Sequence, residues 1–283
     1  MAGTAPGPRP ASASIRPRVF ASTTGHKREP LAATMAVFAK LGLRDLDLNL
    51  HPFIEGDLTP AAAADTAAAY GLRIWAASGG WCDFFQAAPD IDHTFASVAK
   101  QVSIATRLGV PQLRLFFGRR SFFEYTRDAH EAVCRNLVRL SKTHPDLMFV
   151  FENHDGASLH PEICREILER VGRPNIWMNF DPINFAKVHV DPMAALDVVR
   201  PFVAHVHLKG LDNGKFCEFG AGQIDLTPVV HTLLSAGYPG AFSVEYEGDG
   251  DGTVRLVQGV TRAKALIEKL SSWSGGSGPA RGG

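Results

Sequence analysis

Short runs of apolar or alternating residues recur along the chain, and each is followed by a loop and a longer stretch with helical periodicity. Runs of this length, rich in β-branched and aromatic residues, predict strands. The eight predicted strands cover residues 18–23, 43–51, 72–78, 112–118, 147–153, 176–181, 202–210 and 241–247. Because strands and helices alternate strictly, we expect parallel strands that are joined by helical crossovers.

The segments between these runs have the spacing of amphipathic helices. In residues 128–143, Val133, Leu137 and Leu140 fall on one face, and Pro145 follows the predicted end. Eight such strand and helix units predict a single-domain (β/α)8 TIM barrel over residues 17–272. A doubly wound open sheet is the alternative, but no GxGxxG motif follows the first strand. The other helices are predicted near residues 31–41, 59–70, 92–108, 159–171, 191–199, 225–236 and 254–270.

The composition narrows the classes of partner. The 283 residues are 45% hydrophobic, which is enough for a large core, and Lys+Arg and Asp+Glu are each 29. A formal charge of zero argues against binding nucleic acid or an anionic membrane, so a small molecule is the expected partner. No apolar run approaches the ~18 residues of a membrane span.

The cysteines and the chain ends bear on localisation. The four cysteines lie far apart and form no CxxC pair, which favours reduced thiols in a cytoplasmic protein. Residues 1–16 are rich in Pro, Ala and Ser but lack the apolar segment of a secretory signal, and we expect a disordered tail there. The Gly/Ser-rich residues 273–283 are also predicted to be disordered.

Four ionisable residues stand at or near the ends of consecutive predicted strands. In a TIM barrel these ends meet on one face of the molecule. Unpaired charges crowded there would repel one another unless a cation held them together. Three carboxylate oxygens and one imidazole nitrogen suit one divalent metal ion, with Mn²⁺ as the first expectation and Mg²⁺ and Co²⁺ as alternatives. The candidate ligands are Glu152, Asp181, His207 and Glu245.

The motifs around these residues resemble a known family. The runs "FENHDG", "NFDPINF" and "HVHLKG" are similar to the second half of the xylose-isomerase-like TIM barrel superfamily, in its sugar phosphate isomerase/epimerase group, over residues 145–270. The resemblance implies that the four candidates are metal ligands and that Glu152 and Glu245 also serve as general bases on opposite faces of the substrate. A proton next to a metal-bound carbonyl would be removed and returned through an enediolate.

Two features of the sequence bear on the identity of the substrate. Many sugar-acting relatives carry histidine three positions after the strand-six aspartate, where this chain has Asn184, an amide that cannot relay protons near neutral pH. After Glu245 the chain continues with Glu247, Asp249 and Asp251, and an acidic loop argues against a phosphorylated sugar.

Aromatic and polar residues near the strand ends are candidates for binding the substrate. Aromatic rings pack against the apolar face of sugar rings or cyclitols, which indicates a small carbohydrate-like substrate. The candidate substrate-binding residues are His51, Trp81, Phe117, His154, Asn184, Lys209 and Glu218.

Several functions share this fold and site. The first is a metal-dependent isomerase or epimerase of a non-phosphorylated sugar, keto-sugar or cyclitol. The second is a lyase, either a dehydratase of a keto-polyol or hydroxy acid or a C-glycoside deglycosidase that acts by β-elimination. A repair endonuclease would need a basic surface, and a non-catalytic binding barrel would have no reason to retain buried charges. A homodimer is the default expectation for assembly.

Overall fold

The computed structural model describes residues 18–26 and 29–274. Within them, eight parallel strands close into a barrel in the order β1-β10-β7-β6-β5-β4-β3-β2. This confirms the predicted (β/α)8 fold. The strands are β1 (Arg18–Ser22), β2 (Asp45–Asn49), β3 (Arg73–Ser78), β4 (Gln112–Phe116), β5 (Met148–Glu152), β6 (Ile176–Phe180), β7 (Val203–Leu208) and β10 (Ala241–Val244).

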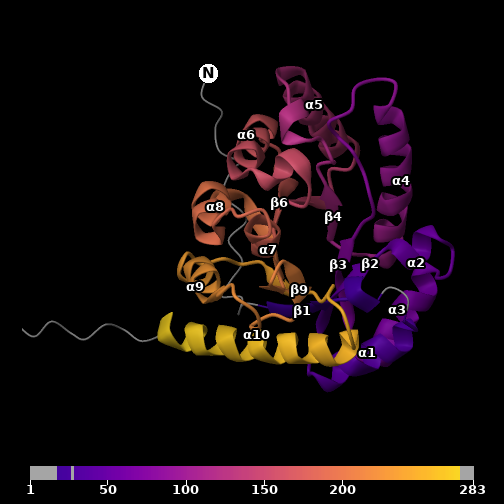
Figure 1. Cartoon of the computed structure of the whole chain (residues 1–283). Coiled ribbons are helices and arrows are strands. Elements are labelled where there is room, and N and C mark those ends of the chain that lie inside the picture. The colour runs from indigo at the N-terminus through magenta and orange to yellow at the C-terminus, as the bar shows by residue number, and fades with distance from the viewer. Residues whose placement is uncertain (1–17, 27–28, 275–283) are drawn as a thin grey trace, which may run out of the picture.

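The eight longer helices follow one another around the outside of the barrel (Figure 1). Several of them begin at a polar N-cap residue. At the start of α5, for example, the Thr126 hydroxyl accepts a hydrogen bond from the backbone N–H of Ala129. None of the described helices is long and apolar enough to cross a membrane. The helices are α1 (Leu31–Lys40), α3 (Pro60–Ala69), α4 (Ile91–Leu108), α5 (Arg127–Thr143), α6 (Pro161–Val171), α8 (Pro192–Val199), α9 (Thr227–Ser235) and α10 (Gly252–Ser274).

Shorter elements join these units, and the sequence pattern did not predict them. A helix of at most five residues, or a strand of three, is too short to establish its period. They are α2 (His51–Ile54), α7 (Pro182–Ala186), the hairpin strands β8 (Gly210–Asp212) and β9 (Lys215–Cys217), and the 3-10 turns η1 (Thr24–His26), η2 (Phe122–Glu124), η3 (Gly156–Leu159) and η4 (Arg200–Phe202).

The predicted tails fall almost entirely outside the described part of the chain. Residues 1–16 lie outside it. Of residues 273–283, the first two form the end of α10, and the others lie outside the described residues.

Each barrel strand turns one set of side chains toward the helices and the other into the barrel. In β2, Leu46 and Leu48 belong to the hydrophobic core, whereas Asp47 contacts side chains from β3, β7 and β10. Strand alternation therefore gives the barrel an apolar outer layer and a polar interior.

Aromatic side chains fill the layer between β5 and its neighbours. Phe151 is fully buried, and its ring centroid lies 5.1 Å from that of Phe117 and 5.6 Å from that of Phe84. Such contacts hold β5 firmly, and β5 carries Glu152 at its end.

We predict that Phe151→Ala lowers the free energy of unfolding by about 3–5 kcal/mol, because it leaves a cavity among packed rings. The matched control is Phe123→Ala, since Phe123 is 95% exposed and its removal leaves no cavity. Urea unfolding followed by circular dichroism measures both, and an equal effect of the two substitutions would contradict the packing described here.

Candidate metal centre

The structure brings four ionisable side chains together at the mouth of the barrel. One potential ligand atom from each of Glu152, Asp181, His207 and Glu245 lies within 4.8 Å of the other three. The Nδ1 atom of His207 is 3.3 Å from Glu152 Oε1 and 3.3 Å from Glu245 Oε2. All four side chains are buried. The ends of β5, β6, β7 and β10 therefore form one cluster of three carboxylates and one imidazole.

Asp181 is fixed by the short helix that follows it. Its Oδ1 atom accepts hydrogen bonds from the backbone N–H groups of Ile183 (2.9 Å) and Asn184 (3.0 Å), so the carboxylate caps α7. Its Oδ2 atom is directed to the cluster and lies 2.9 Å from Lys209 Nζ. One oxygen therefore sets the position of the group, and the other faces the cluster and the Lys209 ammonium.

Two buried cations border the cluster. Lys209 is 1% exposed, and its Nζ atom is 2.9 Å from Asp181 Oδ2 and 2.8 Å from Glu247 Oε1. The Nε atom of Arg114 lies 3.2 Å from Glu152 Oε2. The sequence analysis overlooked Arg114. The only indication of Arg114 in the sequence is that it is the one charged residue in the apolar strand "QLRLF".

The protonation of the cluster follows from burial and from these neighbours. Burial raises the pKa of the Asp181 carboxyl to about 6, although the Lys209 ammonium opposes the shift. Burial acts on Glu245 in the same direction, but the His207 imidazole outweighs it and lowers the pKa of Glu245 to about 2. Burial would lower the pKa of His207, yet the charges of Glu245 and Glu152 raise it well above its usual value. Near neutral pH the carboxylates are therefore ionised.

This donor set fits one divalent cation. Three carboxylate oxygens and an imidazole nitrogen from four strands are the ligands that Mn²⁺, Mg²⁺ and Co²⁺ accept in proteins. A positive ion at their centre would offset the mutual repulsion of the carboxylates.

Asn184 and an aromatic group adjoin the cluster. The Asn184 side-chain amide donates to Glu152 Oε1 at 3.3 Å and to the carbonyl oxygen of Asn153 at 3.0 Å. The rings of Trp81 and Phe116 stack with centroids 4.7 Å apart, and the His154 ring packs against both. The predicted residues Asn184, Lys209, Trp81 and His154 thus lie at the cluster or beside it.

The other three predicted substrate-binding residues have different surroundings. Phe117 is fully buried and packs against Phe151, and its neighbour Phe116 is the ring that meets Trp81. His51 begins α2, and its Nε2 atom pairs with Glu55 Oε2 at 3.2 Å.

Glu218 is held by α10. Its Oε1 atom is 3.1 Å from Arg255 NH1 and 3.4 Å from Arg262 NH1. These two ion pairs occupy the carboxylate that the sequence analysis assigned to the substrate.

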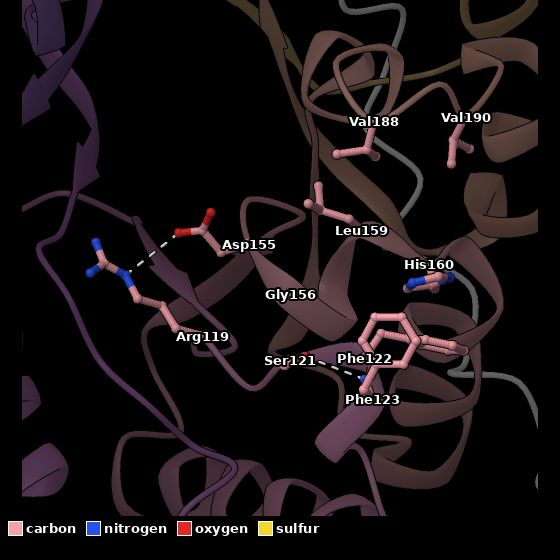
Figure 2. A pocket seen from close by; sticks show the side chains of 10 residues that line it. All are labelled: Arg119, Ser121, Phe122, Phe123, Asp155, Gly156, Leu159, His160, Val188 and Val190. Carbon is pink, nitrogen blue, oxygen red and sulfur yellow. Dashed lines mark hydrogen bonds and ion pairs between the residues drawn. The ribbon is translucent and has the colours of Figure 1, made fainter.

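An open pocket of about 760 Å³ lies among the loops that follow β4, β5 and β6 (Figure 2). Arg119 reaches Asp155 at one side of this pocket, with 3.5 Å between Arg119 Nε and Asp155 Oδ2. At the other side, Phe122 stacks on His160 with ring centroids 3.9 Å apart. The Arg119 guanidinium also lies over the Trp81 ring, so the pocket adjoins the aromatic group beside the cluster.

The sequence is similar to one known protein family. A family model described as xylose isomerase-like TIM barrel matches residues 35–273. No curated protein matches the sequence significantly.

Three solved structures illustrate the structural likeness. L-ribulose 3-epimerase matches with a TM-score of 0.76 and 17% identity, over 91% of this chain and 97% of that one. The probable 3-DHS dehydratase AsbF from Bacillus anthracis gives 0.74 and 12%, over 87% and 98%. The 3-keto-D-glucoside 4-epimerase YcjR from E. coli gives 0.69 and 13%, over 91% and 98%. At these identities the likeness shows a shared fold.

We predict that Lys209→Met destabilises the metal-free protein by about 3–5 kcal/mol, because it leaves buried carboxylates without their cation. The control is Lys215→Met, whose partner Asp249 is 91% exposed; a surface pair contributes about 1 kcal/mol or less. Urea unfolding in the presence of a chelator measures both. Similar losses for the two substitutions would show that Lys209 does not balance the cluster.

Proposed function

Because the chain belongs to the xylose isomerase-like TIM barrel family, we propose that it is a divalent-metal-dependent isomerase or epimerase of a non-phosphorylated sugar, keto-sugar or cyclitol. The observation that carries this proposal is the buried cluster of Glu152, Asp181, His207 and Glu245. Burying three carboxylates together lowers the stability of the fold. Such clusters are therefore typical of sites that bind a cation or catalyse a reaction.

These four residues would hold the metal, with Mn²⁺ as the first candidate and Mg²⁺ or Co²⁺ as alternatives. A bound divalent ion supplies a Lewis acid that polarises a carbonyl and acidifies the neighbouring carbon-bound proton. The ordered ends of β5, β6, β7 and β10 would fix the position of the substrate's oxygens.

Glu152 and Glu245 would move the proton. Glu152 ends β5 and Glu245 follows β10, with β6 and β7 between these strands, and one oxygen of each lies 3.3 Å from His207 Nδ1. A substrate bound over the cluster would therefore meet the two carboxylates from different parts of the rim. One glutamate would remove the proton to give an enediolate of the substrate, and the other would return it. Arg114 and His207 hold the pKa of Glu152 below its usual range against the effect of burial, which keeps this base ionised.

The neighbourhood supports an uncharged substrate. Lys209, which borders the cluster, pairs with Glu247, and Arg119, beside the aromatic group, pairs with Asp155. A phosphate would therefore find no unpaired cation among these groups. Trp81 is 42% accessible, with Phe116 stacked on its ring and the Arg119 guanidinium over it, so the apolar side of a sugar or cyclitol ring would take the place of Arg119 on this ring.

The thiols support a cytoplasmic location as part of this proposal. Cys82, Cys134, Cys164 and Cys217 are all free, which fits a reducing cytoplasm.

Lyase activity is the second candidate, and Lys209 is the observation that favours it. Its ammonium group lies 3.7 Å from Glu245 Oε2, beside one of the proposed bases. In a dehydration, a cation in that position would stabilise the negative charge that develops on the leaving hydroxyl oxygen. A dehydratase or a C-glycoside deglycosidase would use the same cluster, and one of the structural neighbours is described as a probable dehydratase.

We predict that protein purified without chelators carries about one equivalent of divalent metal, as four ligands on one centre require, and that Glu152→Gln and His207→Ala lose it. The control is Glu218→Gln, because Glu218 is a buried glutamate that pairs with Arg255 and Arg262 instead. Plasma mass spectrometry measures the metal content. A wild-type protein that stays metal-free even after reconstitution with divalent metal would contradict the proposal.

We predict that the metal-loaded enzyme exchanges a carbon-bound proton of its substrate with solvent. Incubating unphosphorylated ketoses, 3-keto-glucosides and inosose cyclitols in D₂O should give a product with one deuterium next to the carbonyl and an unchanged carbon skeleton. Glu152→Gln and Glu245→Gln should slow the exchange by about 10²–10⁴-fold.

The same incubation separates the two enzyme classes. Loss of water or of an aglycone, seen by mass spectrometry together with enone absorbance, would assign a lyase. Preference for the phosphorylated counterparts would contradict the proposed substrate class.

A further inference from the structure

A fourth carboxylate lies inside the barrel, outside the cluster of four. Asp47 stands in the middle of β2 between two core leucines, and it is 1% exposed. The sequence analysis did not select it, and the proposed reaction gives it no role. A carboxylate buried this deeply requires partners that compensate its loss of water.

The partners of Asp47 come from three other strands. Its Oδ1 atom accepts a hydrogen bond from the Ser78 hydroxyl at 2.9 Å, and its Oδ2 atom accepts one from the Ser243 hydroxyl at 3.3 Å. The same Oδ2 lies 3.4 Å from His207 Nε2 and 3.7 Å from His205 Nε2. The two serines hold the carboxylate so that one oxygen is directed to the imidazoles.

The two nitrogens of His207 therefore have different surroundings. Nδ1 is directed to Glu152 and Glu245, and Nε2 is directed to Asp47. A neutral imidazole can offer a lone pair at Nδ1 only when its proton is on Nε2. A carboxylate at Nε2 favours that tautomer and fixes the ring plane.

We propose that Asp47 is a positioning residue that holds His207 as the Nε2–H tautomer, with Nδ1 presented to the metal. This inference rests on the proposed metal site and deepens it. Asp47 acts through His207 and does not touch the substrate. The His205 ring stands edge-on to His207, with centroids 5.3 Å apart, and shares the same carboxylate oxygen. His205 thereby packs against the His207 ring and restricts its rotation.

The test compares Asp47→Asn with Asp45→Asn. Asp45 is a buried aspartate on the same strand, but it pairs with Arg73 at 2.6 Å. Free Mn²⁺ is measured by electron paramagnetic resonance during titration of each protein, and circular dichroism with thermal unfolding checks the fold. We expect the dissociation constant of Asp47→Asn to rise about 10–100-fold and that of Asp45→Asn to stay near the wild-type value.

Three outcomes would overturn the inference. Equal Mn²⁺ affinity in wild type and Asp47→Asn would leave the proposed function intact and reject the role of Asp47. Two equivalents of metal in wild type, falling to one in Asp47→Asn, would make Asp47 a ligand instead. Absence of binding by wild type would reject the proposed metal site and this inference together.

A measurement on the wild-type protein keeps the inference testable if Asp47→Asn does not fold. In ¹⁵N-histidine-labelled protein loaded with diamagnetic Mg²⁺ or Zn²⁺, the His207 ring should show a protonated Nε2 and an unprotonated, metal-shifted Nδ1. The opposite tautomer would overturn the proposal whatever the variant does.

Discussion

The structure depends on how the barrel keeps several carboxylates ionised at its mouth without water around them. Like charges within a few ångströms repel strongly in a medium of low dielectric constant. Burying them is tolerable only when cations and hydrogen-bond donors compensate. Arg114 reaches Glu152, Lys209 reaches Asp181, and the Ser22 hydroxyl donates to Glu245 at 3.3 Å. Each of these partners comes from the barrel wall, so the fold and the charge balance support each other.

A closed parallel barrel suits this requirement because its strand ends are fixed by their neighbours on both sides. Ser243 on β10 is in register with His207 on β7, and Glu245 follows two residues later, from where its Oε2 atom lies 3.3 Å from His207 Nδ1. Asp181 gains a second constraint as the cap of α7. Carboxylates that are held in this way cannot move apart to relieve their repulsion, so a cation that enters the site meets ligands that are already ordered.

Much of this arrangement is visible in the sequence, and the parts that are hidden have physical reasons. Strict alternation of strands and helices predicted the barrel, and the positions of Glu152 and Asp181 at strand ends predicted the cluster. Arg114 and Asp47 lie within strands, where a charge between leucines gives no sign of which face it occupies. Phe116, and not the predicted Phe117, contacts Trp81, because neighbouring residues at the end of β4 turn to opposite faces. The partners of Glu218 lie in α10, some forty residues farther along the chain, and no local pattern reveals them.

The mouth of the barrel has two unlike sides, and this constrains how a ring can bind. In the closed order, β10 lies across the barrel from β4. Phe116 at the end of β4 stacks with Trp81, whereas Glu247, just past β10, pairs with Lys209. A ring between them would turn its apolar side toward the aromatic pair and its hydroxyl groups toward the charged pair. A polyol with one apolar face satisfies both sides at once, whereas a phosphate would face Glu247. The asymmetry of the rim therefore supports the proposed uncharged, carbohydrate-like substrate.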